Sequence, residues 1–237
     1  MIPIGDNIPS QRPAVVVKCL VATNICIFLF ELLLMSGGQL EDFFRTFAII
    51  PAREIGSLQQ VLSGNIFVLP LLLLPILTAM FLHGGFFHIA GNMLFLWVFG
   101  DNIEDLMGHW RFLAFYLVCG FGASAAQILS DTSSLVPNLG ASGAIAGVLG
   151  AYLINFPRAR VEAILPLGFF WLPIQVPALF YLGFWFVQQT FYSIASLGVN
   201  SEMGSGGIAF LAHAGGFIFG VSLFKFFAIH KSSQALF

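Results

Sequence analysis

Apolar residues along this chain gather in long runs that are separated by short polar stretches. A transmembrane helix needs about 20 largely apolar residues, and a backbone surrounded by lipid must satisfy its hydrogen bonds internally. Six runs fit this description, at residues 14–35, 85–101, 111–130, 139–156, 176–196 and 207–229. The pattern therefore predicts an all-α membrane bundle of six transmembrane helices.

The polar stretches between these runs are typical of loops. DNIEDLMGHWR is rich in charge, DTSSLVPN is rich in turn-forming residues, and FPRAR combines a helix-ending proline with two arginines. LGVNSEMGSGG is a glycine-rich loop. We expect one membrane domain at 14–230, preceded by a cytoplasmic segment at 1–13 and followed by a tail at 231–237.

Two further apolar stretches are ambiguous. Residues 66–82 are apolar enough for a seventh span, but they contain Pro70 and Pro75, and a proline inside a helix costs about 3 kcal/mol. We therefore predict that 37–84 is one long outer loop that partly dips into the membrane interface. Residues 163–175 contain Pro166 and Pro173 and are predicted to approach the fifth helix along the interface.

The distribution of basic residues agrees with six spans and a cytoplasmic N-terminus, because cytoplasmic loops carry the excess of Lys and Arg. A seven-span chain that starts outside satisfies the same rule, so this test alone does not decide. In the six-span arrangement Arg45 and Arg53 lie outside, and the inner residues are Arg12, Lys18, Arg111, Arg158, Arg160, Lys225 and Lys231.

The composition also indicates a lipid environment. Hydrophobic residues make up 58% of the 237 residues and charged residues only 8%, against about a quarter in a soluble domain. A net charge of −2 gives no sign of nucleic acid, and we expect no such partner. Cys19, Cys26 and Cys119 lie in apolar runs without the spacing of a disulfide or metal site, so we expect no metal and no cofactor. The polar N-terminus does not resemble a cleaved signal peptide.

Four polar residues lie near the predicted outer ends of three helices. His88 and Asn92 begin the second helix, Ser142 begins the fourth, and His213 lies in the second turn of the sixth. At 1.5 Å of rise per residue, each is within roughly 5–10 Å of the outer end of its helix. The topology therefore places all four at a similar depth.

Small residues explain how two of these helices could meet, because helices in lipid approach closely where glycines face one another. Gly143 and Gly147 form one G-x-x-x-G motif, and Gly216 and Gly220 form another. His213 lies on the same helical face as Gly216 and Gly220. Contact between the two glycine faces would bring His213 towards Ser142.

A serine hydroxyl becomes a good nucleophile when a neighbouring base takes its proton, and a buried histidine stays neutral and able to act as that base. No acidic residue is near Ser142 or His213 in sequence, which favours a Ser–His dyad. The side chains of Asn92 and His88 and the backbone N–H of Ser142 are the candidate donors to an oxyanion.

Less specific interpretations of the same residues exist. A serine in a small-residue patch is common helix-packing glue, and His213 could be an interhelical hydrogen-bonding residue. His83 at the mouth of the second helix is predicted to be structural. Gln188 and Gln189 in the fifth helix could be packing glue or could line a cavity, and the sequence does not choose between these roles.

Four segments together resemble the rhomboid intramembrane serine proteases in order, spacing and helix placement. They are HGGFFHIAGNM (83–93), EDLMGHWRF (104–112), GASGAIAG (140–147) and AHAGGFIFG (212–220). The resemblance implies Ser142 as nucleophile and His213 as general base, with His88 and Asn92 holding the oxyanion.

The resemblance also implies roles for other segments. Glu104 and Arg111 would belong to a structural inner loop, and 37–84 would be the outer loop of the family. The fifth helix and residues 197–206 would be a mobile gate and a cap over the site. One departure is Ala146, where many relatives carry an aromatic ring that packs on the catalytic histidine.

The function that follows is hydrolysis of a peptide bond in or near the transmembrane segment of a single-span membrane protein. Such an enzyme would be a multi-pass protein of a bacterial plasma membrane, in contact with the lipid bilayer, with its active site open to the outer face. An inactive rhomboid-like protein that binds membrane helices is the main alternative. A small transporter is a second alternative, although the inverted repeats typical of that class are not visible.

Overall fold

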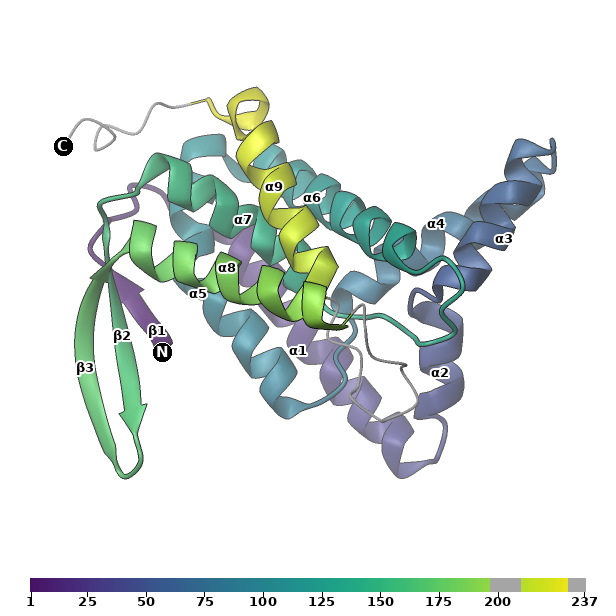
Figure 1. Ribbon diagram of the computed structural model, residues 1–237, viewed down its shortest axis with the longest axis horizontal. Coiled ribbons are helices and arrows are strands. Elements are labelled where there is room, and N and C mark those ends of the chain that lie inside the picture. The colour runs from purple at the N-terminus through teal and green to yellow at the C-terminus, as the bar shows by residue number, and fades with distance from the viewer. Residues whose placement is uncertain (197–209, 230–237) are drawn as a thin grey trace.

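Helices lie in all six ranges that the apolar pattern marks. The computed structural model describes residues 1–196 and 210–229, without the side chains of residues 192–196 and 210. The six helices are α1 (Val15–Ser36), α5 (Phe86–Met107), α6 (His109–Ser130), α7 (Ser142–Asn155), α8 (Ala178–Ser196) and α9 (Phe210–Phe227) (Figure 1). The predicted cap at 197–206 and the tail at 231–237 lie outside the described residues.

Two of these helices, α1 and α6, are each long and apolar enough to cross a membrane alone. A third crossing is reached if α5 is counted together with the apolar segment Ile66–Phe81, from which it is bent by 84°. Helix α7 and residues Leu211–Phe227 of α9 are apolar but shorter. The structure therefore supports a helical membrane protein, and the count of six crossings stays a prediction.

Helix α7 forms the centre of the bundle and contacts α5, α6, α8 and α9. Its residues from Gly143 to Tyr152 are all buried. A methyl group at Gly216 would collide with the carbonyl of Gly143, and one at Gly220 would collide with the carbonyl of Gly147. The backbones of α7 and α9 thus touch, which confirms the predicted close approach. The glycine face of α7 itself is turned to α6, because a Cβ at Gly143 or Gly147 would meet Ala123 or Cys119.

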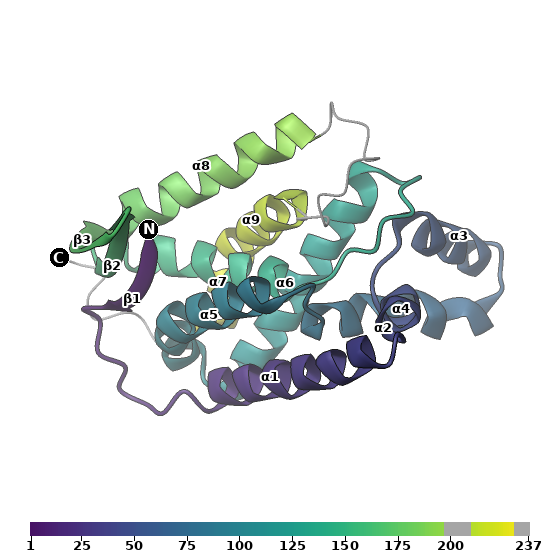
Figure 2. The same ribbon diagram turned by 90° about the horizontal axis from the view of Figure 1, so that it is seen from below.

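The segment 37–84 folds as short helices at one end of the bundle, opposite the end that carries the strands (Figure 2). These helices are α2 (Leu40–Phe47), α3 (Pro51–Leu62), η1 (Ile66–Val68), α4 (Leu69–Thr78) and η2 (Ala79–Phe81). Pro75 lies inside α4, and the 84° bend separates this apolar segment from α5. It is therefore not a straight continuation of the second predicted span.

The segment 37–84 also fixes the chain just before α7. Ile49 and Asn138 exchange backbone hydrogen bonds of 3.0 and 2.7 Å, and the N–H of Gly140 donates to the carbonyl of Ala79 at 2.8 Å. These bonds hold the turn that leads into Ser142 against the outer helices.

At the opposite end, Glu104 joins the start of α1 to the end of α5. Its carboxylate accepts hydrogen bonds of 2.9 and 2.8 Å from the backbone N–H groups of Val16 and Val17. The first N–H groups of a helix lack partners within the helix, so Glu104 caps α1. This contact fits the structural role that the resemblance implied for Glu104.

The prediction of an all-α chain missed a small antiparallel sheet. Strands β1 (Ile2–Asp6), β2 (Arg160–Leu167) and β3 (Phe170–Pro177) pair in the order β1-β2-β3. The segment 163–175 is a β-hairpin that leads into α8, because β2 and β3 pair from Arg160 and Pro177 to Leu167 and Phe170, and its predicted place at the membrane interface stays a prediction.

The hairpin has a local physical reason. Gly168 occupies the first position of the two-residue loop with a φ of 62°, which matches a tight hairpin turn that starts with glycine. Pro173 lies in β3 at the edge of the sheet, where a missing backbone donor is tolerated. Pro166 and Pro173 disfavour a helix but are compatible with these strands.

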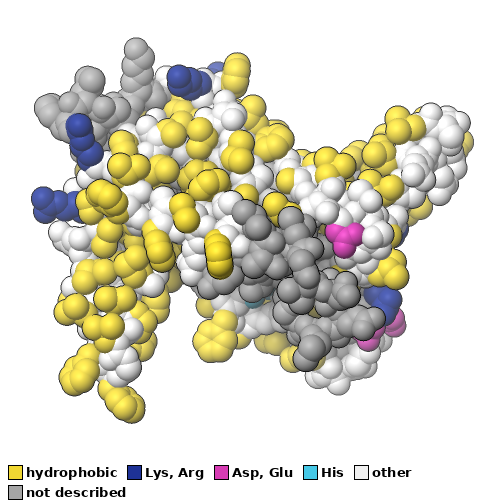
Figure 3. All heavy atoms as spheres, viewed as in Figure 1, with side chains coloured by type: hydrophobic (Ala, Val, Ile, Leu, Met, Phe, Trp, Pro, Cys, Tyr) yellow, Lys and Arg dark blue, Asp and Glu magenta, His cyan; other side chains and the backbone are white. Residues whose placement is uncertain are grey.

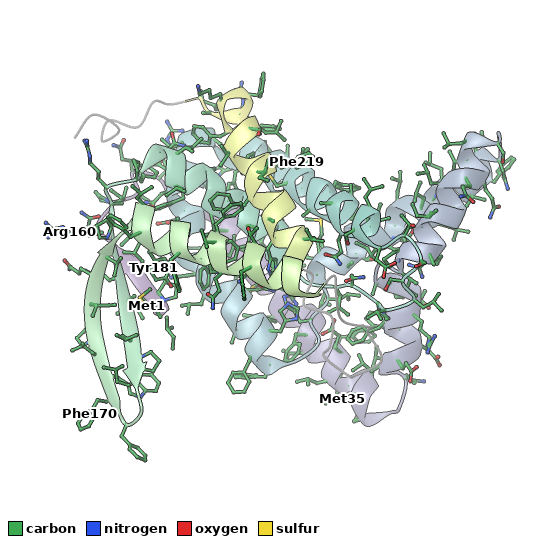
Figure 4. All side chains as sticks on the ribbon, viewed as in Figure 1. Met1, Met35, Arg160, Phe170, Tyr181 and Phe219 are labelled. Carbon is green, nitrogen blue, oxygen red and sulfur yellow. The ribbon has the colours of Figure 1, made fainter. Side chains whose placement is uncertain are left out.

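The N-terminal segment is part of this sheet. The Asp6 carboxylate accepts hydrogen bonds from the N–H of Ile8 and the hydroxyl of Tyr152, at 2.7 and 2.8 Å. The hydroxyl of Tyr181 donates to the carbonyl of Met1 at 3.0 Å, and Figure 4 shows these two residues beside one another. Strand β1 is thereby tied to both α7 and α8.

The glycine contact between α7 and α9 predicts a large effect of adding volume there. Gly220→Val should lower the free energy of unfolding by roughly 1–3 kcal/mol, because overpacking forces the two backbones apart. The matched control is Gly183→Val on α8, where an added Cβ meets no atom within 4 Å. Thermal unfolding in detergent should show a lower Tm for Gly220→Val only. An equal decrease in Tm in both variants would contradict this explanation.

A second prediction concerns pH. Burial raises the pKa of Asp6 from 3.8 to about 6, so the folded protein holds this proton more tightly than the unfolded chain. The stability that this proton contributes is present at low pH and is lost as pH rises through about 6. The Tm of the wild type should therefore fall more than that of Asp6→Asn between about pH 5 and pH 7.5. Identical pH profiles for the two proteins would contradict this expectation.

Candidate active site

Ser142 is the first residue of α7, directly after a turn that needs glycine. Gly140 has a φ of 129°, a backbone conformation that residues with a Cβ rarely adopt. The backbone N–H of Ser142 lies in the first turn of the helix, where N–H groups have no partner within the helix. The fold thus presents a hydroxyl and an N–H at the same helix start.

His213, from the first turn of α9, reaches Ser142. Its Nε2 lies 2.7 Å from Ser142 Oγ, and the residue is 8% exposed. Gly216, three residues later, packs against the backbone of Gly143. The glycine contact between the helices therefore also sets the distance between the imidazole and the hydroxyl.

The other ring nitrogen of His213 faces α8. Nδ1 lies 2.7 Å from Gln189 Oε1. An amide oxygen only accepts hydrogen bonds, so Nδ1 carries the hydrogen and Nε2 presents its lone pair to the Ser142 hydroxyl. In this arrangement Ser142 donates and His213 accepts, which is the direction a proton transfer to His213 would take.

Trp185, also on α8, packs on the imidazole of His213. The two ring centroids are 5.9 Å apart with planes inclined by 37°. Trp185 in turn lies near Phe95 on α5 and Phe217 on α9, with centroid separations of 6.3 and 6.4 Å. An aromatic ring from α8 therefore packs on His213, which the small side chain of Ala146 on α7 cannot do.

His88 shares the space over Gly140 with Ser142. A Cβ placed on Gly140 would lie 2.8 Å from His88 Nε2 and 3.6 Å from Ser142 Oγ. The glycine leaves this space open between the ring and the hydroxyl. His88 therefore lies close to Ser142.

Asn92 is buried and held by a second histidine. Its Nδ2 lies 3.0 Å from His83 Nε2, and the His83 and His88 rings are 5.2 Å apart. The backbone N–H of His83 is bound in turn by the Glu31 carboxylate at 3.1 Å. Since an amide nitrogen carries two hydrogens, Asn92 keeps a second N–H besides the one directed at His83.

A small cavity opens beside Ser142. Ser124, Gln127 and Asn138 contribute its polar wall, and most of the rest is glycine, alanine and larger apolar side chains. The cavity has room for a small group next to the hydroxyl. Among the described residues, no group of three His, Cys, Asp or Glu side chains is placed to hold a metal ion.

The sequence predicts that Ser142 and His213 meet, and the structure brings their side chains together. The sequence leaves two roles open for Gln189 and gives Trp185 none, because contacts between helices far apart in sequence leave no local pattern. His83 was assigned a structural part, and its bond to Asn92 fits that part. The spacing of Trp185 and Gln189, four residues apart and so on one helical face, was the available signal.

Comparison with known proteins gives the family. Residues 72–229 match the model of the Rhomboid domain. The human presenilin-associated rhomboid-like protein, mitochondrial, is 37% identical over 92 residues, which cover 38% of this chain and 24% of that protein.

Two further relatives also carry the name of the rhomboid family. RHOMBOID-like protein 5 of Arabidopsis thaliana is 38% identical over 78 residues, covering 33% of this chain and 25% of the relative. Rhomboid protein 1, mitochondrial, of Saccharomyces cerevisiae is 34% identical over 92 residues, which cover 37% of this chain and 27% of that protein. The matched part spans about a quarter of the length of these relatives. The Rhomboid domain match, in contrast, extends over more than half of this chain, and the chain belongs to the rhomboid family.

Proposed function

We propose that this protein is an intramembrane serine endopeptidase. It hydrolyses a peptide bond in or near the transmembrane segment of a single-span membrane protein. The observation that carries the proposal is the 2.7 Å separation of Ser142 Oγ and His213 Nε2, made by two apolar helices that touch through glycine. Membership of the rhomboid family supports it.

The reaction uses the dyad twice. Ser142 Oγ attacks the carbonyl carbon of the scissile bond while His213 Nε2 takes the hydroxyl proton. The carbonyl π electrons move to oxygen and return as the C–N bond breaks, and His213 gives its proton to the leaving amine. A water molecule then attacks the acyl-enzyme ester, with His213 as base, and releases the new carboxyl group and Ser142.

The negative charge on the carbonyl oxygen needs donors that are already in place. The candidates are the free N–H of the Asn92 amide, the His88 ring and the backbone N–H of Ser142. His83 supports this set because its Nε2 binds the Asn92 amide at 3.0 Å and so fixes the orientation of the side chain. We assign Asn92 and His88 as oxyanion-stabilising residues on this basis.

The pair acts as a dyad in this proposal. The partner of His213 Nδ1 is the neutral amide of Gln189, whereas a Ser-His-Asp triad has a carboxylate there. The amide oxygen of Gln189 is an acceptor like a carboxylate oxygen, so it can fix the ring without a third charged member.

The substrate is a membrane-embedded segment whose backbone can be exposed by local unwinding, because a helical peptide bond is shielded by its own hydrogen bonds. Glycine and alanine line much of the cavity at Ser142, which favours cleavage after small residues. We propose a location in a bacterial plasma membrane, with the site open to the outer face. The relatives from human and yeast, in contrast, carry the word mitochondrial in their names.

Cleavage of a model single-span substrate in liposomes tests the proposal. Wild type should cut the substrate, and both Ser142→Ala and His213→Ala should reduce kcat/KM by at least about 10³-fold, since each removes one half of the reacting pair. The control Ser36→Ala removes a hydroxyl at the end of α1 that does not line the cavity, and it should keep most of the activity.

Two results would contradict the proposal. Cleavage by Ser142→Ala at the wild-type rate would exclude Ser142 as nucleophile. Binding of the substrate by well-folded wild type without any cleavage would favour the alternative, an inactive rhomboid-like protein that binds membrane helices.

A further inference from the structure

Helix α8 contributes no atom to the reacting pair, yet two of its side chains contact the imidazole of His213. Gln189 Oε1 lies 2.7 Å from Nδ1 of His213, and Trp185 packs on the ring with a centroid separation of 5.9 Å. Both side chains come from one face of one helix, because they are four residues apart. The orientation of His213 therefore depends on a third helix.

The Gln189 contact selects one state of the ring. A neutral imidazole has one N–H and one acceptor nitrogen. If Nδ1–H donates to the Gln189 oxygen, Nε2 is the acceptor and faces the Ser142 hydroxyl. The other tautomer would place a hydrogen between Nε2 and Ser142 Oγ, and His213 could then not take the serine proton.

The Trp185 contact limits rotation of the ring about its side-chain bonds. Trp185 is itself held between Phe95 and Phe217, so it cannot easily move aside. Ala146, which is fully buried in α7, offers only a methyl group and no ring to stack on the imidazole. The aromatic support of His213 thus comes from α8.

We propose that Gln189 is a positioning residue for His213, assisted by Trp185, and that α8 sets the tautomer and orientation of the base. This inference rests on the proposed function, because it concerns how the base of that reaction is prepared. It names no new reacting group, since Gln189 acts only through His213.

Three variants test the positioning role. Gln189→Met keeps the length of the side chain but removes the acceptor, and it should lower kcat roughly 10–100-fold with KM changed less than about twofold, since substrate binding is untouched. Gln189→Glu restores an oxygen acceptor and should return kcat to within about threefold of wild type. The matched control Gln188→Met makes the same change on the neighbouring residue and should leave kcat unchanged.

The outcomes separate this inference from the proposed function. If wild type cleaves and Gln189→Met cleaves equally well, the positioning role is wrong while the dyad stands. If Gln189→Met loses activity and Gln189→Glu does not recover it, the acceptor is not what matters and the inference is also wrong. If folded wild type itself does not cleave the substrate, the proposed function is overturned instead.

A second and independent observation concerns the end of the β2–β3 hairpin. Its apolar side chains extend away from the bundle, and Figure 4 shows Phe170 there. We call five residues the hairpin tip: Leu167, Phe169, Phe170, Trp171 and Leu172, which are 54, 102, 79, 64 and 49% exposed. Such a cluster of large apolar side chains is rarely left in water and marks a contact surface.

The charges on this hairpin lie at the opposite end. No charged residue occurs between Glu162 and Glu202 in the sequence, while Arg158 and Arg160 lie at the base of β2. Figure 4 shows Arg160 and Phe170 at opposite ends of the hairpin. Figure 3 shows the same separation, with apolar side chains over the hairpin and basic ones above it.

This separation fits one partner, the lipid bilayer. Strand β3 ends at Pro177 and α8 begins at Ala178, so the hairpin is continuous with a helix whose outer face exposes Leu179, Phe180 and Phe184. An apolar helix face of a membrane protein lies against lipid. Aromatic side chains are favoured at the membrane interface, and arginines are favoured beside anionic headgroups.

We infer that the hairpin tip inserts into the lipid leaflet on the side of the membrane where the sheet lies. Phe169→Cys in a background without native cysteines, labelled with the environment-sensitive fluorophore NBD, tests this in phosphatidylcholine–phosphatidylglycerol liposomes. Lipids with a nitroxide on the acyl chain should quench the label at 169 at least about twofold more than a label on the control Gln175→Cys. Gln175 lies near the base of the same strand.

Two results would overturn this second inference. Quenching of the label at 169 by aqueous iodide but not by the lipid nitroxide would place the tip in water. Energy transfer between labelled copies that disappears on dilution with lipid, without nitroxide quenching, would show that the tip binds a second copy of this chain.

Discussion

The direct contact between the backbones of α7 and α9 is the constraint on which the rest of the site depends. Gly216 and Gly220 on α9 allow this helix to approach until its backbone touches the carbonyls of Gly143 and Gly147, and lipid cannot supply a hydrophobic force to replace such packing. Ser142 and His213 lie on the two helices beside this contact. Their hydrogen bond is therefore a consequence of helix packing, and its length follows from the absence of side chains at these two positions of α9.

Other elements act on the same pair from outside the contact. The segment 37–84 holds the turn before Ser142 through backbone hydrogen bonds at Ile49, Asn138 and Gly140. Helix α8 holds the imidazole through Trp185 and Gln189. One part of the fold thus fixes the proposed nucleophile and another fixes the proposed base. An enzyme needs both constraints, because proton transfer between two groups is sensitive to distance and direction.

The parts that could be predicted from the sequence are those with a local signal. Apolar runs and polar breaks located the helices, and the i, i+3 and i+7 spacing of His213, Gly216 and Gly220 indicated the face that meets α7. The sheet gave a weaker signal, since Pro166 and Pro173 spoke against helix without revealing a partner for β1, which is more than 150 residues away. The supports of His213 are not predicted, because the spacing of Trp185 and Gln189 indicates one shared face of α8 but not the helix that this face meets.

The central claim is that Ser142 is an activated nucleophile because His213 reaches it. The most direct measurement is reaction of the folded protein with a fluorophosphonate, followed by peptide mapping of the adduct. The account predicts that the adduct forms on Ser142 in wild type and that its rate of formation falls by at least about 10²-fold in His213→Ala. Equal labelling of Ser142 with and without His213, or no labelling of folded wild type, would contradict it.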